Sequence, residues 1–180
     1  FPWCEIVNER RYLVFFLFVL LISGCKTSST LSEADMKKKA LEIHNRVLTV
    51  DTHADTPLRM NQPGFDMAER HDPNENGSNV AYPRMIEGGL DAIFFAAFVA
   101  QDIRDDDGNT RAKNLCLQMI DSIIVSTQRN DDIVGLALNP DDAYKLEKAG
   151  KRAIYMGIEN GYPIGKNLSN VELYFEKGVR

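Results

Sequence analysis

Four apolar segments alternate with helical segments along most of this chain, and that alternation constrains the fold more than any other feature. The apolar segments are residues 47–51, 90–100, 132–138 and 152–159. Strands that are apolar on both faces and joined by helices are typical of a parallel sheet covered on both sides. The sequence therefore predicts an α/β fold.

Capping residues mark the beginnings of two helices. Ser32, with Asp35 three residues later, predicts the start of a helix over residues 31–47. Asn139 followed by Pro140 predicts the start of another helix after the third apolar segment. The resulting order is one leading helix followed by four strand-helix pairs.

The longest predicted helix covers residues 109–130, where apolar side chains recur at helical spacing. We expect its buried stripe to contain Leu115, Met119, Ile120, Ile123 and Ile124. Cys116 lies in the same helix and is expected to be a small buried hydrophobic residue. It has no strand-end position and no obvious His partner, which argues against cysteine catalysis.

Two architectures match this order of elements, an open doubly wound sheet and a (β/α)₈ barrel. The first strand is not followed by a glycine-rich phosphate turn, which disfavours a nucleotide-binding open sheet. A barrel typically needs about 250 residues. The alternating part of this chain would supply about half of one, and both architectures remain open at this point.

The N-terminal segment is expected to be a targeting signal. Two arginines, the apolar run 13–22 and Ser-Gly before Cys25 occur in the order of a lipoprotein signal. This predicts a signal peptide at 1–25 with lipid on Cys25, a tether and leading helix at 26–46, and the partial barrel at 47–180. The protein would then be exported and anchored on a bacterial membrane, facing the periplasm or cell surface. The alternative is a buried apolar helix with an incidental cysteine.

The charge balance excludes one class of partner. The formal net charge is −5 and 44% of residues are hydrophobic, so no basic excess indicates nucleic acid binding.

Chemically active side chains follow two of the predicted strands. His53 and Asp55 come after the first strand, and Glu159 ends the fourth. The carboxyl ends of parallel strands meet at one rim of the sheet, so these groups are expected to converge. One imidazole and two carboxylates are a ligand set for zinc or a similar divalent ion. The alternative is that the carboxylates only stabilise turns. His44 and His71 are expected to be solvated, although His71 could reach a substrate.

Three sequence blocks resemble the membrane (renal-type) dipeptidases, a family of zinc metallopeptidases. The blocks are "VDTHADTPL", "RMIEGGLDAIFFAAFV" and "AIYMGIENGYPIGKNL", and the similarity covers about Val47 to Arg180. The resemblance implies the N-terminal half of a (β/α)₈ TIM barrel, so that this chain is a fragment of a protein that hydrolyses dipeptides, often with a D-residue at the C-terminal position. It also implies a metal-bound hydroxide as nucleophile, His53 and Asp55 as ligands of one Zn²⁺, and Glu159 as a bridge to a second.

The chain departs from the family pattern in two ways. Ala54, Thr56 and Asn160 replace the usual Asn, Leu and Gly, and none of these is a ligand. The family also takes two His ligands, a substrate-contacting His, an Arg and an Asp from later strands. The resemblance therefore implies that only one ion's ligands are complete here and that the fragment is inactive alone. The parent protein is a candidate homodimer.

Two other functions remain open from the sequence. One is a different metal-dependent barrel hydrolase, although those barrels usually carry His-x-His after the first strand, where this chain has Asp55. The other is a non-catalytic surface lipoprotein.

Overall fold

The computed structural model describes residues 31–76 and 78–180. The chain divides into two compact units, the second of which is Leu41–Arg180. The predicted signal peptide and the lipid site at Cys25 lie outside the described residues. Within the described ranges, no helix is both long enough and apolar enough to cross a membrane.

The leading helix begins where its capping residues predict. Helix α2 spans Glu33–His44, and Ser32 Oγ accepts a hydrogen bond from the Asp35 amide at 3.1 Å. The same hydroxyl donates to the Asp35 carboxylate at 2.6 Å. The helix has no buried residue.

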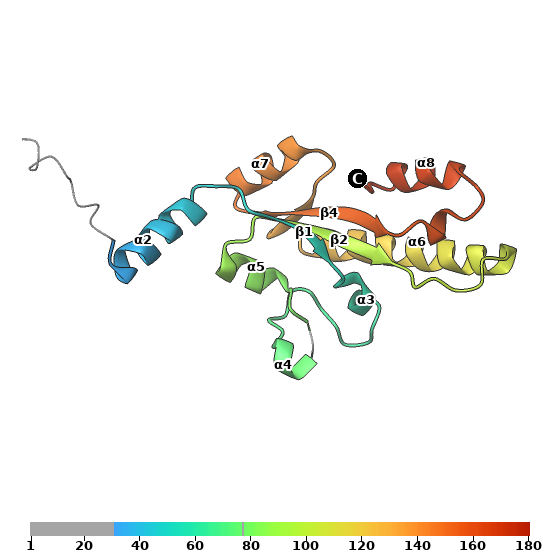
Figure 1. The fold of residues 1–180 in the computed structure, drawn as a ribbon, viewed down its shortest axis with the longest axis horizontal. Helices are drawn as coiled ribbons and strands as arrows, with labels where there is room; N and C mark the ends of the chain where they lie inside the picture. Colours follow the sequence, from blue (N-terminus) through green and yellow to red (C-terminus); the bar gives the residue numbers. More distant parts are fainter. Residues whose placement is uncertain (1–30, 77) are drawn as a thin grey trace, which may run out of the picture. The chain divides into compact units, whose positions relative to one another are not determined.

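The second unit is built on a four-stranded sheet in which all neighbours are parallel (Figure 1). The strands are β1 (Val50–Ala54), β2 (Ala92–Phe98), β3 (Val134–Leu136) and β4 (Arg152–Glu159). The predicted α/β fold with a parallel sheet is confirmed. The first strand was expected over residues 47–51 but begins at Val50 and continues to Ala54, because pairing with β2 extends the strand into its polar part.

The strand order is β1-β2-β4-β3, so β4 lies between β2 and β3. A simple barrel made from the predicted strands would place consecutive strands side by side. Strand β3 pairs only with the first residues of β4, Arg152 to Ile154. Further along, Val179 forms a parallel bridge to Met156, and the Arg180 amide donates to the Met156 carbonyl at 2.9 Å. The outer edge of β4 is therefore shared between β3 and the residues that follow the last helix.

The helices cover the two faces of the sheet unequally. The main helices are α5 (Tyr82–Gly88), α6 (Asp106–Arg129), α7 (Pro140–Lys148) and α8 (Ser169–Glu176), with short helices α3 (Pro57–Met60), α4 (Pro73–Asn76) and η1 (Tyr162–Ile164). Helix α6 packs on the face that carries Ile93, Phe95, Ile154 and Met156. Helix α7 packs near Tyr155 on the other face. The chain passes from β2 outward to β3 and then back to β4, so two right-handed crossovers put α6 and α7 on opposite faces of the sheet (Figure 1).

The buried stripe of α6 follows most of the prediction. Met119, Ile120 and Ile123 are buried, as is Cys116. Leu115 was expected in the stripe but is 46% exposed. The observed stripe continues instead through Ala112 and Thr127, at helical spacing from Cys116 and Ile123.

The cap of α7 provides a test of local stability. Asn139 Oδ1 accepts a hydrogen bond from the Asp142 amide at 3.2 Å. Replacing Asn139 by Ala is expected to lower the free energy of unfolding by about 1 kcal/mol, because an N-terminal amide of the helix loses its acceptor. Urea unfolding measures this change.

Leu168 provides the matched control, because it is the N-cap of α8 and makes no side-chain cap bond. A Leu168→Ala change is expected to stay within roughly 0.5 kcal/mol of the parent sequence. Equal effects of the two substitutions would contradict a capping role for Asn139.

Candidate metal centre

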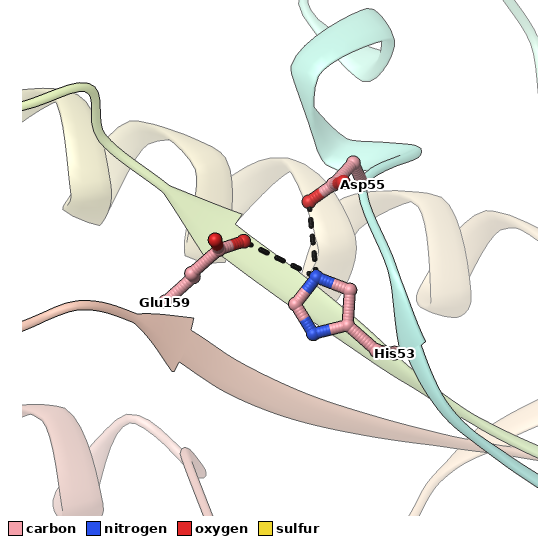
Figure 2. A group of neighbouring side chains, drawn as sticks. All are labelled: His53, Asp55 and Glu159. Carbon is pink, nitrogen blue, oxygen red and sulfur yellow. Dashed lines mark hydrogen bonds and ion pairs between the residues drawn. The ribbon is translucent and has the colours of Figure 1, made fainter.

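The carboxyl ends of β1 and β4, which lie on either side of β2, carry the three predicted site residues. His53 lies within β1, Asp55 follows β1 directly, and Glu159 is the last residue of β4. Their donor atoms all lie within 4.8 Å of one another. In Figure 2 the His53 ring lies between the two carboxylates, which come from different strands.

Two short distances in the cluster involve the same ring nitrogen, His53 Nε2. His53 Nε2 is 3.3 Å from Asp55 Oδ1 and 3.2 Å from Glu159 Oε2. Donors held at about 2.0–2.2 Å from one tetrahedral zinc ion are roughly 3.3 Å apart. The donor types and the two distances from His53 Nε2 are therefore those of ligands that share one divalent cation. The side chains of His53, Asp55 and Glu159 are 52%, 53% and 41% exposed, so water and a substrate can reach the cluster.

An irregularity in β1 decides which way His53 faces. Asp51 pairs with Ile93, but Ala54 pairs with Phe95, so three steps along β1 match two along β2. An uninterrupted register would pair His53 with Phe95, whose side chain lies in the core under α6. The extra residue places Ala54 there, and Ala54 packs against that core. His53 is thereby turned toward Glu159.

The turn after β4 is hydrogen-bonded to the segment that follows β2. Asn160 has a φ of 62°, a left-handed conformation that Asn adopts more readily than most residues. Its Nδ2 donates to the Val99 carbonyl and its Oδ1 accepts from the Tyr162 amide, both at 2.9 Å. Asn160 thus forms hydrogen bonds on both sides of the turn. The carboxylate of the preceding residue, Glu159, lies beside His53.

The other histidines and Cys116 stay away from this cluster. His44 Nε2 lies 2.9 Å from the Gly88 carbonyl. His71 was expected to be solvated, but it is only 5% exposed and stacks on Phe65 with ring centroids 4.4 Å apart. The prediction was wrong because the long polar loop folds back on itself around this ring. Burial raises the pKa of the Cys116 thiol to about 12, so the thiol stays protonated near neutral pH.

Sequence reasoning missed three residues beside the cluster. Asp51 accepts a hydrogen bond from the His53 amide at 3.0 Å. Arg59, on α3, lines a cavity of about 450 Å³ together with Asp51, His53, Asp55 and Asn79. The signal for Asp51 was its position two residues before His53, whereas nothing in the sequence indicated that Arg59 and Asn79 share a cavity. A larger cavity of about 590 Å³, between α6 and residues 60–67, contains none of the three cluster residues.

A protein-family comparison matches most of the chain. The family described as "Membrane dipeptidase (Peptidase family M19)" matches residues 37–180. Two curated fungal proteins are also similar. Dipeptidase ataJ of Aspergillus terreus is 27% identical over 149 residues, which is 79% of this chain and 36% of that protein. Dipeptidase tcpJ of Claviceps purpurea is 23% identical over 121 residues, which is 64% of this chain and 28% of that protein.

Solved structures share the fold. The probable dipeptidase PvdM from Pseudomonas aeruginosa superimposes with a TM-score of 0.72 at 23% identity, over 82% of this chain and 37% of that one. A metallopeptidase from Rhodobacter sphaeroides, liganded with a phosphinate mimic of the dipeptide L-Ala-D-Ala, gives a TM-score of 0.61 at 19% identity. That match covers 74% of this chain and 44% of that one. This chain therefore spans less than half the length of the proteins it resembles here.

Proposed function

Because the chain belongs to the membrane dipeptidase family, peptidase family M19, we propose that it is part of a zinc-dependent dipeptidase. The observation that carries the proposal is the meeting of His53, Asp55 and Glu159 at the ends of β1 and β4, with 3.2 and 3.3 Å between donors. A parallel α/β sheet directs these groups to one rim, where enzymes of this fold class form their active sites.

In the proposed centre, His53 Nε2 and one oxygen each of Asp55 and Glu159 hold a zinc ion. His53 must be neutral there, with its proton on Nδ1, so that the Nε2 lone pair faces the ion. Glu159 would also help to hold a second ion, for which later strands would supply the remaining ligands. When bound, such ions lower the pKa of a shared water and polarise the scissile carbonyl. The carboxylates of Asp55 and Glu159 would offset the charge of the ion that they hold with His53.

We also propose the arrangement of the longer parent protein. Strands β1, β2 and β4 are neighbours in the sheet, and Val179 continues the pairing along β4. These would be successive strands of a (β/α)₈ barrel, with β3 as a short addition at the amino end of β4. The partial barrel would cover 47–180, after a tether at 26–46 and a lipoprotein signal at 1–25. On this proposal, residues 26–180 alone lack the second ion's ligands and do not hydrolyse dipeptides, and the parent is an exported, lipid-anchored protein and a candidate homodimer.

Metal removal tests the proposed chemistry. Dialysis of the full-length parent against a chelator is expected to abolish hydrolysis of L-Ala-D-Ala, and added Zn²⁺ is expected to restore it. L-Ala-D-Ala is the first substrate to test because the Rhodobacter sphaeroides relative was solved with a mimic of that dipeptide. Released alanine and the zinc content per chain are measured in the same samples. Full turnover by protein that holds no metal would contradict the proposal.

A further inference from the structure

We infer that Asp51 is a positioning residue, whose carboxylate holds the irregular part of β1 so that His53 and Asp55 face Glu159. The inference rests on the proposed metal centre, and it assigns Asp51 no contact with the metal or the substrate. Asp51 is outside the cluster of candidate ligands among the described residues. Its role would be to fix the backbone on which two of those ligands stand.

The backbone of β1 is irregular directly before the two ligands. Between Asp51 and Ala54 the register with β2 shifts by one residue, as a β-bulge does. A bulge leaves one residue of the strand without its regular ladder partner. The His53 amide lies inside this interval and donates to Asp51 Oδ1 at 3.0 Å. The side chain of Asp51 thus takes over a hydrogen bond that an uninterrupted ladder would supply to the backbone.

The register shift decides to which face of the sheet the His53 side chain points. Side chains alternate along a strand, so moving the register by one residue exchanges the faces of every following side chain. Without the bulge, His53 would occupy the position opposite Phe95, which is fully buried, and Ala54 the position opposite Ala96. With it, the small Ala54 packs against the core, and His53 lies 3.2 Å from Glu159. The metal ligands are therefore correctly aimed only while the bulge persists.

The bulged pairing of β1 competes with regular pairing to β2. Regular pairing would return a backbone hydrogen bond to the ladder, so the bulge needs a local interaction that favours it. Asp is suited to this because its short side chain accepts from the amide two residues later. Asp51 is exposed, so its removal opens no cavity in the core. Its loss is expected to change the aim of His53 more than the stability of the fold.

The test compares three variants at position 51 with one matched control. Asp51→Ala removes the acceptor, Asp51→Asn keeps a carbonyl oxygen in the same place, and Asp51→Ser keeps a weaker acceptor. Asp72→Ala is the control, because the exposed Asp72 makes the same kind of bond to the Asn74 amide, at 2.8 Å, away from the cluster. All are made in the full-length protein.

Three quantities are measured for each variant. They are the Zn²⁺ dissociation constant by chelator competition, the melting temperature of the metal-free protein, and the hydrogen-exchange rate of the His53 amide in the metal-free protein. Asp51→Ala is expected to weaken zinc binding by about 10- to 100-fold, as for other residues that orient ligands. It should also speed His53 amide exchange, with a melting temperature close to that of Asp72→Ala. Asp51→Asn is expected to keep the zinc dissociation constant and the His53 exchange rate near those of the parent. Asp51→Ser is expected to give values between those of Asp51→Asn and Asp51→Ala.

The outcomes separate the inference from the proposed function. Parent protein that binds no zinc rejects the proposed metal centre, and the inference with it. Parent protein that binds zinc, with Asp51→Ala binding equally well, rejects the inference alone. Loss of binding in Asp51→Asn as large as in Asp51→Ala would also overturn it, since charge and not the hydrogen bond would then matter. If Asp51→Ala fails to fold, equal zinc affinities of Asp51→Asn and Asp51→Ser would reject it.

Discussion

Replacing His53 by Ala together with Glu159 by Gln is expected to lower dipeptide hydrolysis by the full-length protein on the order of a thousandfold or more. His53 supplies the nitrogen that faces both carboxylates, and Glu159 contributes the oxygen 3.2 Å away. Ligands of one ion act as a unit, so the double variant should lose little more than either single variant. Steady-state rates and bound zinc, measured on the same protein, check both expectations.

A second pair of residues of the same types provides the control. His44 bonds to the Gly88 carbonyl, and Glu176 is exposed at the end of α8. The His44→Ala/Glu176→Gln double variant changes the same numbers of imidazoles and carboxylates outside the cluster. It should keep its zinc and most of its activity. Turnover in the His53→Ala/Glu159→Gln variant that equals this control would remove the basis of the proposed function.

Replacing Ile154 by Ala is expected to lower the free energy of unfolding by about 2–5 kcal/mol. Ile154 is fully buried on β4, in the core between the sheet and α6. The substitution removes apolar contacts and leaves a cavity that the surrounding strands can fill only in part. Urea denaturation of the full-length protein, followed by circular dichroism, measures the change.

Ile103 allows the same substitution at the surface. Its side chain is 65% exposed, and its carbonyl, which accepts a hydrogen bond from Tyr162, is unchanged in an Ala variant. Ile103→Ala is expected to change stability by less than about 0.5 kcal/mol. A loss for Ile154→Ala no larger than that for Ile103→Ala would show that the α6 core does not stabilise the sheet as described.

Short-range signals explain why several elements were predicted well. Strand β4 has the predicted bounds, Arg152–Glu159, because its apolar run is continuous and is bounded by a helix end and a turn. Helix α7 starts after Asn139 as predicted, because its cap bonds lie within three residues. Each of these features depends on neighbours in the sequence.

Long-range pairing explains the errors. The first strand was predicted over residues 47–51, but pairing with β2 carries β1 on to Ala54. The order β1-β2-β4-β3 was not foreseen, because hydropathy identifies strands and not their neighbours. His71 was assigned to solvent because its loop is polar, but its ring is buried against Phe65.

The sequence by itself determined the α/β class, the helix caps and the three side chains expected at one rim, because strand direction and local hydrogen bonding follow from residue type and spacing. His53 and Asp55 are two residues apart on an extended chain, so they point the same way whatever the register. Only the tertiary structure decided to which face of the sheet these two side chains point. A one-residue shift against β2 exchanges the two faces of β1, and that shift depends on pairing with a strand about forty residues away.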